Sequence, residues 1–263
     1  MGKTKIIAIT YEKGGVGKTT TAVNLSAVLA EKGFRVLLVD LDPQSYATSY
    51  YDLYDDSLPS ITGVMMGKNK AREAIRPTGI ENLDLLPGSY DFKDVETFLM
   101  MKTRRQEYTL REAMADVSSA YDYIFMDCPP SGNRIKTNAL AYADYVILPT
   151  IPDDYAIHGL LCMANELVEI RQGVNPSLDV LGVLVTIYER TANKKAYTEA
   201  LQRQDIFPCF RTLIRKNSAL SAAINAHKPI NLYARRSNGC TDYTALTDEI
   251  IQRLEGGNTH GEN

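Results

Sequence analysis

A glycine-rich stretch with two lysines is the part of the sequence best suited to chemistry. It lies between the apolar runs 6–10 and 36–39 and contains Lys13, Gly14, Gly15, Val16, Gly17, Lys18, Thr19 and Thr20. Glycines let the backbone curl so that successive N–H groups point at phosphate oxygens, and a helix that begins here adds the positive end of its dipole. Lys18 can then reach the β- and γ-phosphates of a nucleotide, and the Thr19 hydroxyl can bind Mg²⁺. Because the order strand, loop, helix, strand surrounds this pattern, we predict a phosphate-binding P-loop.

Carboxylates follow two of the apolar runs. Asp40 and Asp42 come directly after Val39, and Asp127 ends the run 123–126. In open α/β sheets the ligand-binding edge lies at the carboxyl ends of the strands. An apolar run that ends in Asp is typical of a Walker B strand, whose carboxylate polarises a water bound to Mg²⁺. The sequence therefore predicts a magnesium site that includes Thr19, Asp40 and Asp127, with a metal or water-positioning role for Asp42.

The same apolar runs predict the fold. Continuous apolar runs without alternation are typical of strands buried on both faces of a parallel sheet, and helical spacing separates them at 17–32, 156–172 and 241–254. We expect an α/β fold: a single doubly wound, mostly parallel sheet with helices on both faces. We also expect a surface connection at 46–61, a helix at about 63–75 and a short strand near 209–214. One domain should span 1–255, followed by a flexible tail at 256–263.

Composition narrows the class of protein. The chain has 263 residues, of which 44% are hydrophobic and 23% charged, as in ordinary soluble globular proteins. It has no apolar run of eighteen residues that could span a membrane, and because its first residues pass directly into an apolar strand we expect no signal peptide. The four cysteines are far apart and form no CxxC pair, so we expect neither a zinc site nor disulfides and place the protein in the cytoplasm.

Positive charge is concentrated in residues 186–236. This segment contains ten Lys and Arg against three Asp and Glu, a surplus of seven positive charges in a chain whose net charge is −3. A basic region on an acidic protein is typical of a nucleic-acid contact. The alternative is an ordinary solvated surface.

Three parts of the sequence together resemble one family. The stretch Lys-Gly-Gly-Val-Gly-Lys-Thr at 13–19, the stretch 40–44 and the stretch 127–131 resemble the ParA/MinD group of P-loop ATPases with a deviant Walker A motif, in particular the short, Soj-like form of ParA. The resemblance extends from 6 to about 254. It implies that Lys13 reaches across a dimer interface to the nucleotide of the other subunit, that Asp42 orients the attacking water, and that Asn217 contacts adenine. ATP is favoured over GTP because Asn193-Lys194-Lys195-Ala196 lacks the aspartate that reads guanine.

The resemblance also implies a function. ParA-type proteins are DNA partition ATPases: the ATP-bound homodimer holds non-specific double-stranded DNA, and hydrolysis resets it when a ParB-like centromere-binding protein stimulates it. A cytoplasmic, nucleoid-associated location would follow. Arg190 matches one DNA-contacting arginine of the family, whereas Ala219 stands where a second one is found, so Arg215, Lys216, Arg235 or Arg236 could replace it. MinD anchors to membranes through a terminal basic amphipathic helix, which the polar tail 255–263 does not match. An alternative function is a nucleotide-switched regulatory or binding module with little turnover, acting on replication, transcription or a protein partner.

Overall fold

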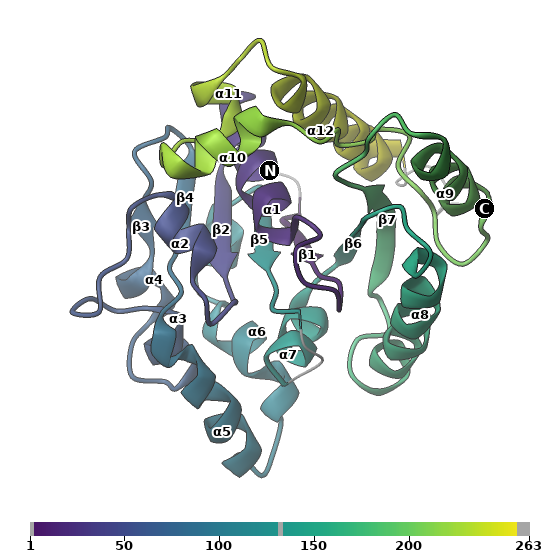
Figure 1. Cartoon of the computed structure of the whole chain (residues 1–263). Helices are drawn as coiled ribbons and strands as arrows, with labels where there is room; N and C mark the ends of the chain where they lie inside the picture. The colour runs from purple at the N-terminus through teal and green to yellow at the C-terminus, as the bar shows by residue number, and fades with distance from the viewer. Residues whose placement is uncertain (1–2, 131–133, 257–263) are drawn as a thin grey trace.

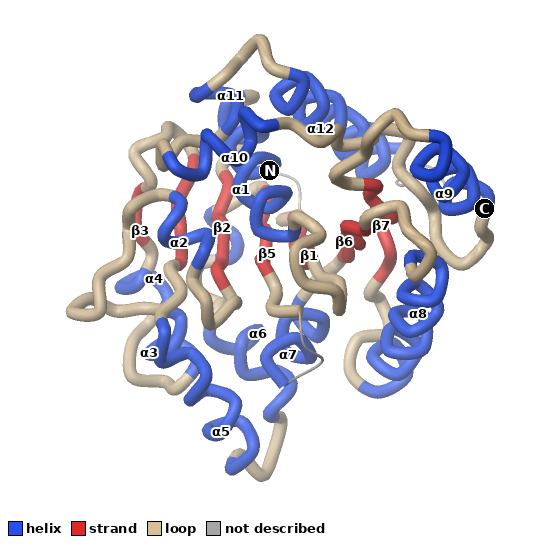
Figure 2. The backbone as a smooth tube through the Cα atoms, in the orientation of Figure 1, coloured by secondary structure: helices blue, strands red, loops and turns tan. Residues whose placement is uncertain are grey.

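A single seven-stranded sheet forms the centre of the structure, a computed structural model that describes residues 3–130 and 134–256. The strand order is β3-β4-β2-β5-β1-β6-β7, and every pair in it is parallel except β3 with β4. The strand bounds are β1 (Lys5–Ile9), β2 (Val36–Asp40), β3 (Arg76–Pro77), β4 (Leu83–Leu86), β5 (Tyr123–Asp127), β6 (Tyr145–Thr150) and β7 (Asp179–Val185). β1 and β5, which lead to the P-loop and to Asp127, lie side by side in the middle of the sheet (Figure 2).

Alternating side chains of the strands other than β3 contribute to two hydrophobic cores, one on each face of the sheet. Ile7 and Ile9 of β1 belong to one core and Ala8 to the other, as the two-residue period of a strand requires. The first core is covered by α1 (Lys18–Glu31), α2 (Tyr46–Tyr50), α10 (Ser218–Asn225), α11 (Ile230–Tyr233) and α12 (Asn238–Gly256).

The second core is covered by the remaining α-helices. They are α3 (Ile61–Met65), α4 (Ala71–Ala74), α5 (Lys93–Met101), α6 (Thr109–Ala113), α7 (Arg134–Tyr142), α8 (Ala156–Gly173) and α9 (Ala192–Arg203). In Figure 1, α10, α11 and α12 lie along the upper edge of the view and α5 to α8 in its lower half. The predicted fold class, a doubly wound and mostly parallel sheet, is confirmed.

Three local expectations were wrong. The stretch 46–61 begins with the helix α2, whose Tyr50 is 3% exposed and packs in the core. The helix expected at 63–75 is two short helices, α3 and α4, because Gly67 between them takes a left-handed conformation with φ of 73°. No strand forms at 209–214 in this described part of the chain. Isolated bridges at Cys209 and Arg215 replace it, and the intervening N–H groups of 211 and 212 donate to the Glu249 carboxylate instead of to a strand.

Two sequence features lie beyond the described residues. Ser131, at the end of the motif that begins with Asp127, is one, and most of the expected tail, residues 257–263, is the other. Among residues 3–130 and 134–256, no helix combines the length and the apolar character needed to cross a bilayer.

Candidate active site

The glycine-rich loop connects β1 to α1 and takes a conformation that only glycine adopts easily at two positions. Gly15 and Gly17 have φ values of 73° and 85°, in the left-handed region where a Cβ would add strain. The loop curls around the Lys18 ammonium, whose Nζ donates to the carbonyl oxygens of Tyr11 and Lys13 at 3.2 and 3.3 Å. Burial lowers the pKa of Lys18, and the negative charge of Asp127 opposes this effect. The sequence thus places a desolvated cation inside a ring of backbone groups, as phosphate binding requires.

Asp127 and Asp40 are neighbours at the ends of adjacent strands. The register of β2 and β5 pairs these two residues directly, and both are fully buried. Neither carboxylate oxygen of Asp127 has a hydrogen-bond partner among the described residues. Burial raises the pKa of Asp127 well above its ordinary value, and the negative charge of Asp40 raises it further, although the nearby Thr19 hydroxyl and the Lys18 charge oppose this rise. A buried carboxylate without a partner fits a divalent cation, since a bound ion would supply the missing charge.

Asp40, in contrast, already has three donors. Its Oδ2 accepts from the Thr48 amide at 2.8 Å and from the Thr48 hydroxyl at 2.7 Å, and its Oδ1 accepts from the Asp42 amide at 3.2 Å. Burial raises the pKa of Asp40 to about 6, although the Thr48 hydrogen bonds oppose this. The Thr48 hydroxyl also accepts from the Gly88 amide at 2.7 Å. Asp40 therefore joins the end of β2 to α2 and to the loop after β4, and Asp127 fits a metal better than Asp40 does.

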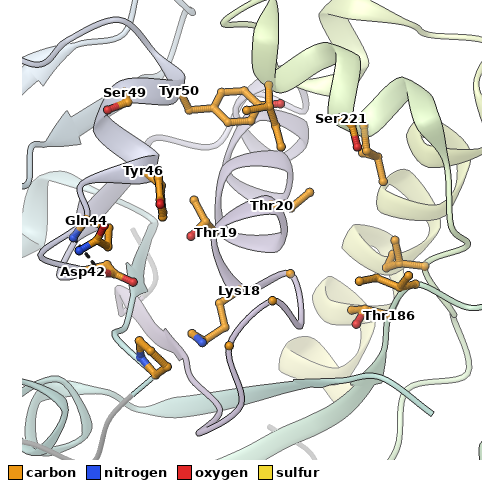
Figure 3. A pocket seen from close by; sticks show the side chains of 18 of the residues that line it. Lys18, Thr19, Thr20, Asp42, Gln44, Tyr46, Ser49, Tyr50, Thr186 and Ser221 are labelled. Carbon is orange, nitrogen blue, oxygen red and sulfur yellow. Dashed lines mark hydrogen bonds between the residues drawn. The ribbon is translucent and has the colours of Figure 1, made fainter. Parts of the chain in front are cut away.

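A cavity of about 1100 Å³ opens beside the P-loop, and Figure 3 shows Lys18, Thr19 and Asp42 around it. Asp42 is half-buried, and its Oδ1 accepts from the Gln44 amide at 2.9 Å, which fixes the carboxylate at the mouth of the loop. Of the residues predicted to bind ATP, the cavity is lined by Gly14, Gly15, Gly17, Lys18, Thr19, Thr20 and Asn217. Val16 is buried beneath the loop, where its carbonyl accepts from the Thr186 hydroxyl at 2.8 Å. Lys13 is not among the lining residues.

Part of the cavity wall is suited to a base. This part includes Ile187, Ile214 and Leu220, which offer an apolar surface. Asn217 caps α10, since its Oδ1 accepts from the Ala219 amide at 2.9 Å. Among the described residues no partner of the Asn217 side-chain N–H group is seen.

The five predicted DNA-contacting residues occupy different surroundings. Arg215 lines the cavity, and the buried Asp242 holds its guanidinium through Nε at 3.0 Å and Nη2 at 2.5 Å. Lys216 also lines the cavity and pairs with Glu189 at 3.0 Å. Arg235 pairs with Glu31. The other two, Arg190 and Arg236, are exposed and form no ion pair within the described residues.

Sequence reasoning missed the α2 side of the cavity. The cavity is lined on this side by Tyr46, Ser49 and Tyr50 (Figure 3). The sequence pattern of the Tyr- and Asp-rich stretch 46–61, which contains them, instead predicts a surface connection. The buried Tyr50 offered one signal, because its ring belongs to the apolar face of a helix one turn long. Thr186, which ties the P-loop to the end of β7, lies 170 positions from Val16 and had no sequence signal.

Comparison with known proteins agrees with this geometry. A family model described as an AAA domain matches residues 4–180. The chromosome partitioning protein ParA of Myxococcus xanthus is 37% identical over 95% of this chain and 88% of its own length. The sporulation initiation inhibitor protein Soj of Bacillus subtilis is 38% identical over 94% of this chain and 98% of its own.

A solved structure of a differently named protein has the same fold. Cobyrinic acid a,c-diamide synthase from Mycobacterium smegmatis, with a bound ATP analogue and magnesium, superposes with a TM-score of 0.86 at 32% identity over 97% of this chain and 96% of that one. The fold alone therefore does not separate functions within this group. The P-loop with its second lysine, the carboxylates at the same sheet edge and the near full-length similarity to ParA and Soj show that the chain belongs to the ParA/Soj family of partition ATPases, within the ParA/MinD group of P-loop ATPases.

Proposed function

We propose that this protein is a DNA partition ATPase whose ATP-bound homodimer binds double-stranded DNA without sequence preference and is reset by hydrolysis. The observation that carries the proposal is that the two lysines of the loop lie in different surroundings. Lys18 faces the cavity, whereas Lys13 does not line it and is about half exposed. A loop lysine that points away from its own cavity is placed where it can meet a nucleotide held by a second subunit.

The residues at and behind the cavity wall have distinct roles in hydrolysis. Lys18 binds the β- and γ-phosphates of ATP, and its partial burial strengthens that contact. Asp42 orients the attacking water from the mouth of the loop. Asn217 contacts the base. Thr19 at the cavity and the buried Asp127 would hold Mg²⁺, which would supply positive charge for the phosphates.

Two substitutions separate binding from turnover. Lys18→Ala should abolish ATP binding, because the phosphates lose their direct cation. Asp42→Ala should bind ATP but not hydrolyse it, and its ATP complex should sediment as a dimer. Wild-type turnover by Asp42→Ala would contradict its catalytic role, and an ATP complex that stays monomeric would contradict the dimer.

DNA binding should depend on the cations that are not neutralised in the fold. Arg190 and Arg236 are exposed within the basic segment 186–236 and have no acidic partner in the described chain. Phosphate contacts supply affinity without sequence information, so these two residues should weaken binding to all sequences alike when removed. We expect a nucleoid-associated, cytoplasmic protein from such binding, with a ParB-like centromere-binding protein as the partner that stimulates hydrolysis.

The experiment is a DNA titration with ATP at two salt concentrations. Arg190→Ala/Arg236→Ala should lose affinity and salt dependence relative to wild type. The matched control is Lys68→Ala/Arg111→Ala, which removes two exposed cations outside the basic segment. Wild-type binding that ignores ATP and salt, or no binding, would favour the alternative of a regulatory module with little turnover. A single domain over residues 1–255 remains part of the proposal.

A further inference from the structure

Lys13 is held by a carboxylate of its own subunit. Its Nζ donates to Oδ2 of Asp153 in an ion pair. Asp153 belongs to the loop between β6 and α8, 140 positions away in the sequence. The Lys13 side chain is 46% exposed and that of Asp153 is 26% exposed, so the pair is partly open to solvent. Because the pair lies at the surface, the Lys13 side chain can separate from Asp153 and turn towards a second subunit.

The loop that carries Asp153 is fixed to a helix of the basic segment. Lys194 of α9 donates from Nζ to the Pro152 carbonyl at 2.9 Å. Tyr197, one turn further along α9, donates its hydroxyl to Asp154. These two contacts flank Asp153 in the sequence. The Asp153 carboxylate therefore belongs to an anchored loop. Anchoring lowers the entropic cost of forming the ion pair, because less of the chain has to be ordered.

The backbone of Lys13 is held as well. Its carbonyl oxygen accepts from Nζ of Lys18 at 3.3 Å, so one residue has its main chain bound by the phosphate-binding lysine and its side chain bound by Asp153. Phosphates in the cavity compete for the Lys18 ammonium, because they carry more charge than a carbonyl oxygen. Asp153 is then the remaining restraint on Lys13.

We propose that Asp153 is a positioning residue that keeps Lys13 within its own subunit until the nucleotide of a second subunit offers a stronger anion. The inference rests on the proposed function, since it concerns a lysine that acts across a dimer. Asp153 consequently opposes dimerisation. An ion pair with this exposure shifts an equilibrium by a factor of about 1.4 to 5. A symmetric dimer must break two of them, so removal of Asp153 should lower the dimer dissociation constant by a factor of about 2 to 25.

The first test needs no dimer. Nucleotide-free protein is treated briefly with acetic anhydride, and the acetylation of each lysine is followed by mass spectrometry. Asp153→Asn should acetylate Lys13 about 1.4 to 5 times faster than wild type. The matched control is Glu12→Gln, which removes an exposed negative charge next to Lys13 but leaves the pair with Asp153. Equal rates at Lys13 in wild type and Asp153→Asn, or an equal gain in Glu12→Gln, would overturn the inference.

The second test measures the dimer by analytical ultracentrifugation with saturating ATP, in the Asp42→Ala background that prevents turnover. Asp153→Asn should tighten the dimer, and the gain should vanish when Lys13→Gln is also present, because the two residues act as a pair. A weaker dimer in Asp153→Asn, or the same gain without Lys13, would overturn the inference. A parent protein that stays monomeric with ATP would contradict the proposed function, and the acetylation rates would still decide whether Asp153 holds Lys13.

Discussion

Asp127→Asn should make the nucleotide-free protein more stable while it abolishes magnesium-dependent function. Asp127 is fully buried, has no hydrogen-bond partner for either oxygen within the described chain, and pairs in register with a second buried carboxylate, Asp40. A buried polar group without a partner costs about 1–3 kcal/mol, and more when it is charged. Asparagine has nearly the same volume and remains polar but has no charge, so the expected gain comes from removing the buried charge. For a chain of this length each kcal/mol shifts Tm by about 2–4 °C, so the substitution should raise Tm by about 2–12 °C.

The pH dependence has a definite sign. Burial raises the folded-state pKa of Asp127 above its unfolded value, so its protonated form stabilises the fold. That contribution is complete below the unfolded pKa of about 3.9 and is lost as pH rises through the folded pKa. For Asp40, whose folded pKa is about 6, the same window runs from about 4 to 6. The advantage of Asp127→Asn should therefore be small at pH 5 and large at pH 8.

Thermal unfolding at both pH values, with and without ATP and Mg²⁺, measures these effects. Wild type should gain about 2.7 kcal/mol from a ligand at one hundred times its dissociation constant, and Asp127→Asn should lose the magnesium-dependent part of this gain. Asp116→Asn, which removes an exposed carboxylate, is the control and should change neither. A lower Tm for Asp127→Asn at pH 8 without nucleotide, or an undiminished response to Mg²⁺, would refute the reasoning.

Three further substitutions test the packing around the site. Thr48→Val removes the 2.7 Å donor of Asp40; it should raise the pKa of Asp40 and cost about 1–3 kcal/mol in urea unfolding at pH 8, with a smaller deficit at pH 5 where Asp40 is protonated. Glu166→Leu takes the 2.5 Å carboxylate from the fully buried Lys136. It should cost about 1–3 kcal/mol, after allowance for the 24% exposure of Glu166, and a stability equal to wild type would contradict this. Gly182→Ala would place a Cβ 2.7 Å from an aromatic ring and should lower stability by about 1–3 kcal/mol while ATP binding is retained.

The central half of the sheet and the phosphate site could be predicted from the sequence, because both depend on contiguous residues. The runs that form β1, β2 and β5 are apolar except for Lys5 at the start of β1 and the aspartates that end β2 and β5, so a strand buried on both faces was the consistent choice. Their carboxyl ends meet at one edge by the geometry of parallel sheets. Thr19, Asp42 and Asp127 therefore came together as soon as the strands were assigned.

The remaining features depend on pairings between distant residues. The bidentate contact of Arg215 with Asp242 spans 27 positions, and the contact of Lys13 with Asp153 spans 140. Hydrophobic periodicity carries no information on which acid a given cation will meet. For the same reason the strand expected at 209–214 failed, since the Glu249 carboxylate from α12 took the amide groups that a neighbouring strand would have bound. The local sequence pattern predicts helices and strands, whereas polar contacts between distant residues determine the surroundings of individual charged side chains.

The same pairings decide how much of the basic segment is left for DNA. Its surplus of seven positive charges includes Arg215 and Arg235, which are paired with acids outside the segment, Asp242 and Glu31. Arg190 and Arg236 are exposed and without an ion pair in the described residues. Each phosphate contact contributes about 0.9 to the slope of log affinity against log salt. If only these two act in each subunit, four contacts per dimer give a slope of about −3.6. A slope twice as steep would mean that further cations of the segment contact DNA, either other exposed ones such as Arg211 and Lys228 or ones released from internal pairs. A slope near zero would mean that the charges are ordinary solvated surface.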